Sequence, residues 1–149
     1  MKFSSNICYD LRKIDFICVA SFTNVKNQKF LINCLKSINK NCSVVFLGTG
    51  PNLECCKNEA KNVKKCKISF LGHVQNVNEY LGNAKCLILP SISEGNPLVL
   101  NEAVSSGTYI IASNVGGVKD VVKNEDFGQS FELYKNDDIY FNKNFEKKN

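Results

Sequence analysis

The sequence predicts a three-layer α/β/α domain built on a parallel sheet of about six strands, and three observations indicate this class. Short apolar runs rich in Val, Ile and Phe recur along the chain. Between them lie segments of about ten residues in which apolar side chains follow a helical period. The joints are short and rich in Gly, Asn and Pro. Strands that alternate with helices require right-handed crossovers, which produce a parallel sheet covered by helices on both faces.

Each predicted element is a short stretch bounded by turn residues. The predicted strands are 15–20, 43–47, 67–71, 86–89, 109–112 and 127–133. The predicted helices are 28–38, 52–63, 76–81, 97–106 and 119–122. Gly107 follows the fourth helix at the place of a C-terminal stop. The arrangement is Rossmann-like, and ligands of such open sheets bind beyond the carboxyl ends of the strands.

We divide the chain into three parts: a lead-in over 1–13, one Rossmann-like domain over 14–133, and a polar tail over 134–149. A chain of 149 residues is long enough to bury one core of its own. The tail is rich in Asn and Lys and has no clear periodicity. We expect it to fray when it has no partner to pack against.

The composition is that of an ordinary globular domain, with 44% hydrophobic and 22% charged residues. The net charge of +5 comes almost wholly from scattered lysines, since Arg12 is the only arginine. This scatter disfavours a nucleic-acid partner and fits an anionic small ligand or an anionic membrane surface better. No apolar run is long enough to span a membrane, and charges interrupt the start of the chain too often for a signal peptide. We expect a cytoplasmic protein, with peripheral attachment to the inner face of the membrane as an alternative.

Eight cysteines raise the question of disulfides or zinc. No CxxC pair is present, and Cys18, Cys34 and Cys86 fall within apolar patterns, where free cysteine behaves as a small buried hydrophobic residue. We therefore expect reduced thiols, as in a cytoplasm. A zinc site that uses Cys55, Cys56 and Cys66 is the weaker alternative.

The segment SISEGNPLVLNEAVSSG, residues 91–107, is the strongest candidate site. It places Glu94 and Glu102 eight positions apart, with a Gly-Asn-Pro turn between them that leads into the fourth helix. A loop glycine lets backbone N–H groups approach a ligand, and a helix N-terminus suits a phosphate. The carboxylates would then face hydroxyls, such as the diols of a sugar or a ribose. From spacing alone, two solvated surface acids explain the pair equally well.

Other candidates follow the remaining strands. Lys26 lies in the loop after the first strand and could pair with a phosphate there, although most loop lysines only increase solubility. Gly116 and Gly117 follow the fifth strand and would let backbone amides approach an anion or a sugar. His73, the only histidine, has no evident orienting partner, so we expect it to line the pocket. The run Gly48-Thr49-Gly50-Pro51 matches no phosphate-binding motif and predicts a tight turn.

Taken in order, these phrases resemble the C-terminal donor-binding domain of a GT-B retaining glycosyltransferase of family 4 ("group 1"). The matching phrases are VVFLGTGP, ISFLGHVQNVNEYLGNAKCLILPS, SEGNPLVLNEAVSSGTYIIAS and NVGGVKDVV. They cover roughly residues 14–133, and Glu94 with Glu102 reproduces the E-x7-E element of the family. The resemblance implies a nucleotide-sugar donor. We expect a UDP-sugar, with a GDP- or ADP-sugar as the alternative, and no metal ion or other cofactor.

The resemblance also implies roles for single residues. Glu94 would meet the hydroxyls of the transferred sugar, Lys26 would face the donor diphosphate, and Glu102 would hold the ribose of the nucleotide. We regard Glu94 and Lys26 as the catalytic residues. The remaining substrate-binding residues lie in loops or at the start of the fourth helix, His73 and Val74 beside the base and the others near the sugar and phosphates: Gly95, Asn96, Pro97, Leu98, His73, Val74, Gly116 and Gly117.

Two departures from the family matter. The family commonly has an arginine beside the lysine position, where this chain has Ser21-Phe22-Thr23. Only about fourteen residues precede the first strand, too few for the acceptor-binding N-terminal domain. We expect a retaining transferase of surface-polysaccharide or glycoconjugate synthesis that is inactive alone. It would need a separate N-terminal GT-B chain and would act on a glycan or a lipid-linked glycan. The alternatives are a catalytically silent nucleotide-sugar-binding module or truncated gene fragment, and an unrelated α/β nucleotide-binding protein.

Overall fold

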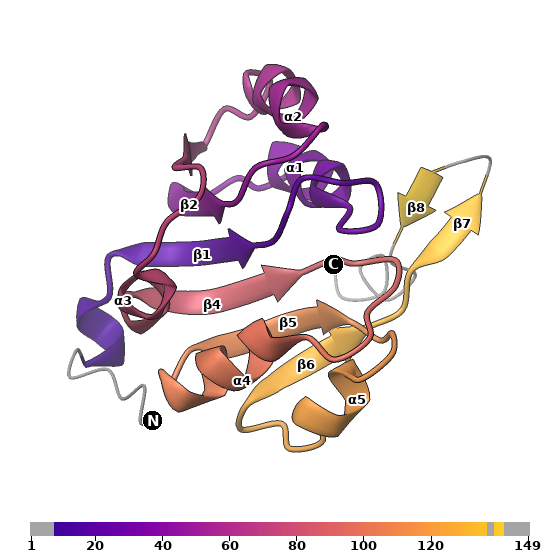
Figure 1. The fold of residues 1–149 in the computed structure, drawn as a ribbon. Coiled ribbons are helices and arrows are strands. Elements are labelled where there is room, and N and C mark those ends of the chain that lie inside the picture. Colours follow the sequence, from indigo (N-terminus) through magenta and orange to yellow (C-terminus); the bar gives the residue numbers. More distant parts are fainter. Residues whose placement is uncertain (1–7, 137–138, 142–149) are drawn as a thin grey trace.

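The computed structural model describes residues 8–136 and 139–141, and its main feature is a six-stranded parallel sheet (Figure 1). The strand order is β3-β2-β1-β4-β5-β6. The strands are β1 (Ile14–Val19), β2 (Cys42–Leu47), β3 (Cys66–Phe70), β4 (Ala84–Leu89), β5 (Tyr109–Ser113) and β6 (Gly128–Phe131). The chain first runs outward from β1 to β3, then returns to β4 on the other side of β1. The predicted fold class is confirmed.

Helices cover both faces of this sheet, α1 and α2 on one and α3, α4 and α5 on the other (Figure 1). They are α1 (Gln28–Lys36), α2 (Leu53–Ala60), α3 (Val77–Gly82), α4 (Leu98–Ser105) and α5 (Val118–Val121), preceded by a 3-10 turn, η1 (Tyr9–Leu11). Each predicted helix and strand is present, with small shifts at its ends. No helix among the described residues has the length and apolarity needed to cross a bilayer.

Two apolar layers form the core, one on each face of the sheet. Ile17 and Cys18 are neighbours on β1 and both are buried, but they belong to different layers because successive strand residues point to opposite faces. On the α1 side, Phe22 contacts the rings of Phe46 and Phe70 at 5.9 and 6.0 Å between centroids. The central strands are thus buried on both faces, as their apolar composition predicts.

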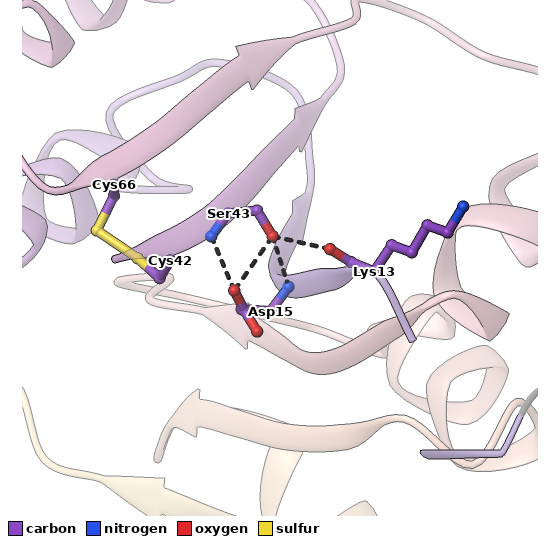
Figure 2. The surroundings of a disulfide bond; sticks show 5 residues. All are labelled: Lys13, Asp15, Cys42, Ser43 and Cys66. Atoms are coloured by element: carbon purple, nitrogen blue, oxygen red, sulfur yellow. Dashed lines mark hydrogen bonds between the residues drawn. A yellow bond between two sulfur atoms is a disulfide. The ribbon is translucent and has the colours of Figure 1, made fainter. Parts of the chain in front are cut away.

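A disulfide joins Cys42 to Cys66, the first residues of β2 and β3, with 4.6 Å between their Cα atoms (Figure 2). For this pair the expectation of reduced thiols was wrong. The cysteines are 24 positions apart, and only the parallel register of β2 and β3 places them opposite one another. Since Cys66 is oxidised, it is not available to the zinc site that we considered.

Other cysteines behave as the sequence predicted. Cys18 and Cys86 are buried free thiols, and burial raises the pKa of each to about 12. Both therefore stay protonated at neutral pH and act as small apolar side chains. No cluster of three or more His, Cys, Asp or Glu residues suited to a metal ion occurs in the part of the chain that the structure describes.

Reduction of the Cys42–Cys66 bond should lower the free energy of unfolding. The bond closes a loop with a sequence separation of 24, and the loss of that constraint in the unfolded chain corresponds to about 3 kcal/mol. Urea unfolding with and without a thiol reductant measures this difference, and a Cys42→Ser variant should lose the sensitivity to reductant. Superimposable curves for the native protein, together with two additional alkylatable thiols before reduction, would contradict it.

The only arginine, Arg12, was not predicted to have a structural role. Its buried guanidinium donates to the carbonyls of Ser106 at 2.8 Å, Ala84 at 2.9 Å and Gly107 at 3.0 Å. Burial lowers the pKa of Arg12, because a charge taken out of water is less stable. Arg12 thereby ties the lead-in before β1 to the C-terminal end of α4, where helix carbonyls lack partners.

The tail differs from the expectation at its beginning. Strands β7 (Tyr134–Asn136) and β8 (Ile139–Phe141) pair antiparallel in a short hairpin. Residues 137–138 and 142–149, the remainder of the tail that we expected to fray, lie outside the described residues.

Candidate functional site

The candidate site lies at the carboxyl ends of β1 and β4, where the strand order reverses. Here Lys26 Nζ, in the loop after β1, lies 2.7 Å from Glu94 Oε1, in the loop after β4. The two loops are also joined by a 2.7 Å hydrogen bond from the Ile92 N–H to the carbonyl of Val25. The Glu94 side chain is only 6% exposed and that of Lys26 is 27% exposed. Reversal points of open α/β sheets are the usual ligand sites, so the structure brings two of the predicted residues together at the expected edge.

Ser91 is a third member of this cluster that sequence reasoning missed. Its hydroxyl donates to Glu94 Oε1 at 2.6 Å, and the residue is fully buried. The hydroxyl of Ser113, at the end of β5, donates to the carbonyl of Ser91. The only available signal was the position of Ser91 directly after the strand-ending Pro90, which is too common to indicate a role.

Gly116 and Gly117 pack against the loop that carries Glu94 and do not face open space. Gly116 has φ +52°, and a Cβ added to it would lie 1.6 Å from the carbonyl oxygen of Glu94. The Gly117 N–H donates to the carbonyl of Gly95 at 3.1 Å. This N–H is therefore already used, in contrast to the free donor that we expected. The glycine pair shapes the loop that carries Glu94.

Helix α4 begins at Leu98, directly after Pro97, and presents its N-terminus at the same edge. No side chain caps this end of the helix. The Leu100 N–H donates to the carbonyl of Pro97, whereas the N–H groups of Leu98 and Val99 have no hydrogen bond within the described residues and carry a partial positive charge. Leu98 is 67% exposed and Asn96 is also exposed. Glu102 lies one turn further along and is half-buried, and within the described residues its carboxylate has no hydrogen bond or ion pair.

His73 and Val74 follow β3, two strands away from β1. His73 is exposed, whereas Val74 packs partly against the core beneath α3 and α4. The Gly48 N–H donates to the carbonyl of Gly72 at 2.7 Å, which holds this loop to the turn after β2. These residues share the carboxyl edge with Lys26 and Glu94, but no hydrogen bond in the described part of the chain joins them to that pair.

The turn after β2 is tight, as predicted. A Cβ on Gly48 would lie 2.0 Å from the carbonyl oxygen of Ala20, and one on Gly50 would lie 2.4 Å from that of Phe22. These close approaches bring the β2 turn against the loop that carries Lys26. Its glycines therefore serve backbone packing, which agrees with the absence of a phosphate-binding motif.

Two cavities border these loops. One of about 470 Å³ lies between α4 and α5 and is bordered by Gly95, Asn96 and Gly117. The other, of about 290 Å³, lies beside α1 and α2 and is bordered by Asn27 and Gln28. Lys26, Glu94 and Glu102 line neither cavity. The charged cluster is thus on the edge of the domain rather than inside an enclosed pocket.

Comparison with known proteins assigns the sequence of this chain to a family. The model of the family described as glycosyl transferases group 1 matches residues 9–141. The capsular polysaccharide biosynthesis glycosyltransferase CapH of Staphylococcus aureus is 33% identical over 122 residues, which is 74% of this chain and 34% of CapH. The N-acetyl-alpha-D-glucosaminyl L-malate synthase of Bacillus anthracis is 28% identical over 120 residues, 78% of this chain and 32% of the relative.

A solved structure agrees in fold. Anabaena HepE in complex with UDP and glucose superposes with a TM-score of 0.70 at 16% identity, over 83% of this chain and 36% of HepE. The chain spans about one third of the length of the curated relatives that it matches. Its fold is one Rossmann-like half of a GT-B glycosyltransferase. From the match over most of its length, the chain belongs to the glycosyl transferases group 1 family.

Proposed function

We propose that this chain binds a nucleotide-sugar donor at the carboxyl edge of β1 and β4, as the donor half of a retaining glycosyltransferase. The observation that carries the proposal is the meeting of Lys26 and Glu94, 2.7 Å apart, at the reversal point of the sheet. The uncapped N-terminus of α4 follows Glu94 within the same loop. A cation, a carboxylate and free helix N–H groups at one edge suit a ligand that carries both phosphates and hydroxyls.

The chemistry of glycosyl transfer explains why the proposed site needs a cation and N–H donors as well as carboxylates. When the glycosyl group leaves the donor, the nucleoside diphosphate departs as an anion, so the main demand is stabilisation of negative charge. In our proposal Lys26 and the α4 N-terminus meet the diphosphate, and no metal ion is needed. Glu94 accepts hydrogen bonds from the transferred sugar and Glu102 from the ribose, while His73 and Val74 lie beside the base.

We expect uridine as the base, with guanosine or adenosine as the alternative, because HepE binds UDP and glucose. The Lys26 side chain is 27% exposed, and the chain spans about one third of the length of its relatives. We therefore propose that an N-terminal GT-B domain, on a separate chain or as the remainder of a longer protein, supplies the other wall. The name of CapH supports an acceptor glycan or lipid-linked glycan of surface-polysaccharide synthesis. Such work would be cytoplasmic, at or near the inner face of the membrane.

A second candidate function is nucleotide-sugar binding without catalysis, as in a silent module or a truncated gene fragment. One observation favours it. Phe22 occupies the loop stretch where the family commonly has an arginine, and Phe22 is 1% exposed against the ring of Phe46. The diphosphate would therefore lack one charge-assisted contact, which corresponds to about a ten- to hundredfold loss in rate or affinity.

Titration of the chain with UDP, GDP and ADP tests the donor site. We expect UDP to bind and Glu102→Ala to weaken binding about tenfold, because a charge-assisted hydrogen bond to the ribose is lost. Glu125→Ala, an exposed acid before β6, is the matched control and should leave the affinity unchanged. The absence of binding by all three nucleotides up to millimolar concentration would contradict the donor site. Addition of an N-terminal GT-B domain and an acceptor then separates the two functions, since the silent module stays inactive.

A further inference from the structure

Two donors share one oxygen of Glu94. Ser91 Oγ lies 2.6 Å and Lys26 Nζ 2.7 Å from Glu94 Oε1. Within the described residues, no hydrogen bond reaches the second oxygen, Oε2. The carboxylate is thus held at one oxygen, and the other remains an acceptor for a ligand hydroxyl.

The two donors differ in how firmly they are held. Ser91 is fully buried, its carbonyl accepts the Ser113 hydroxyl, and the next residue, Ile92, donates its N–H to the carbonyl of Val25. Lys26 is partly exposed, and its ammonium ends a flexible four-carbon stem. Ser91 is therefore the fixed donor to Glu94, and Lys26 is the donor that can move.

We propose that Ser91 is a positioning residue that holds the Glu94 carboxylate while Lys26 exchanges Glu94 for the donor diphosphate. This inference rests on the proposed donor site. Without a donor, Lys26 neutralises a carboxylate that is only 6% exposed, and a buried charge needs such a partner. A diphosphate at the α4 N-terminus carries more negative charge than one carboxylate and so attracts the ammonium more strongly.

Once Lys26 has moved, Glu94 keeps the Ser91 hydroxyl and gains the hydroxyls of the sugar. A buried carboxylate without any donor would be strongly unfavourable, so the Ser91 bond makes the exchange possible. It also leaves Oε2 directed at the sugar. Ser91 should therefore support the binding of the nucleotide, which removes Lys26 from Glu94, as well as the binding of the sugar, which needs Glu94 held in place.

The first test compares Ser91→Ala with Ser93→Ala, an exposed serine in the same loop, by calorimetric titration with UDP, UDP-glucose, UDP-galactose and UDP-N-acetylglucosamine. We expect Ser91→Ala to weaken both UDP and the UDP-sugar that binds best about tenfold, because the departure of Lys26 then leaves Glu94 Oε1 without a donor. Ser93→Ala should match the native chain. Unaltered UDP affinity in Ser91→Ala, or a native chain in which no UDP-sugar binds more tightly than UDP, overturns the positioning role.

The second test uses Glu94→Gln, which keeps the shape of the side chain and removes its charge, and remains informative even if Ser91→Ala does not fold. If Lys26 exchanges partners, Glu94→Gln frees the ammonium, so UDP should bind a few-fold more tightly while the sugar-dependent gain disappears. Lys26→Met should instead weaken UDP. In the Glu94→Gln background, Ser91→Ala should have no further effect on UDP affinity, whereas a merely structural role would give additive losses. Weaker UDP binding by Glu94→Gln overturns the exchange. A native chain that binds no nucleotide contradicts the donor site itself.

Discussion

Gly116→Ala is expected to reduce UDP affinity about a hundredfold, the scale of loss associated with a displacement of about 1 Å in a positioned site. Its Cβ would lie 1.6 Å from the carbonyl oxygen of Glu94, a distance at which the backbone of one loop must move. The left-handed φ of +52° adds strain, because a side chain is disfavoured in that conformation. The expected shift displaces Glu94 and, with it, the Lys26–Glu94 pair.

Ser93→Ala is the control for this experiment. Ser93 lies in the same loop, and its side chain is exposed. UDP titration and thermal unfolding of both variants measure the difference. Equal affinities for the two variants would show that the close approach of Gly116 to the Glu94 carbonyl does not determine the position of the loop.

Arg12→Met should lower the free energy of unfolding by about 3 kcal/mol or more, since buried hydrogen-bond acceptors then lose their donor. Replacement of a buried charge by an apolar side chain can be neutral where its partners are replaced as well. Here the carbonyls of Ala84, Ser106 and Gly107 would remain and would lose the guanidinium. The methionine side chain fills part of the volume, so lost hydrogen bonds rather than a cavity account for the effect.

Urea unfolding of Arg12→Met measures this loss, with Lys13→Met as the control. Lys13 is the neighbouring exposed cation, and its ammonium has no ion pair among the described residues, so its replacement should change stability by less than about 0.5 kcal/mol. A loss for Arg12→Met no larger than that of the control would indicate that water replaces the guanidinium at these carbonyls.

The loops that carry Lys26 and Glu94 show how much of the candidate site can be predicted from the sequence alone. Local patterns placed each residue just beyond a strand end, and parallel strands end at the same edge. The family resemblance added that both belong to one site. That they form an ion pair, with Glu94 nearly buried, depends on β1 and β4 being neighbours in the sheet. No pattern within either segment contains that information.

Ser91, Gly117 and the Cys42–Cys66 pair show which contacts could not be predicted from the sequence. Serine after a strand-ending proline has no distinctive signal, yet its hydroxyl is held against Glu94 by the fold. The Gly117 N–H was expected to face a ligand, but the approach of two loops gives it the Gly95 carbonyl instead. The absence of a CxxC pair argued against disulfides, whereas the register of β2 with β3 formed one.

The sequence by itself determined the alternation of strands and helices, the parallel sheet and the segments that could carry a donor site, because periodicity and turn residues act over a few neighbouring positions. The tertiary structure alone decided which of those segments meet. It paired Lys26 with Glu94, brought the Ser91 hydroxyl within hydrogen-bond distance of Glu94, and placed the only arginine at the C-terminal end of α4. These contacts depend on strand order, register and burial, which arise only when segments far apart in the chain pack together.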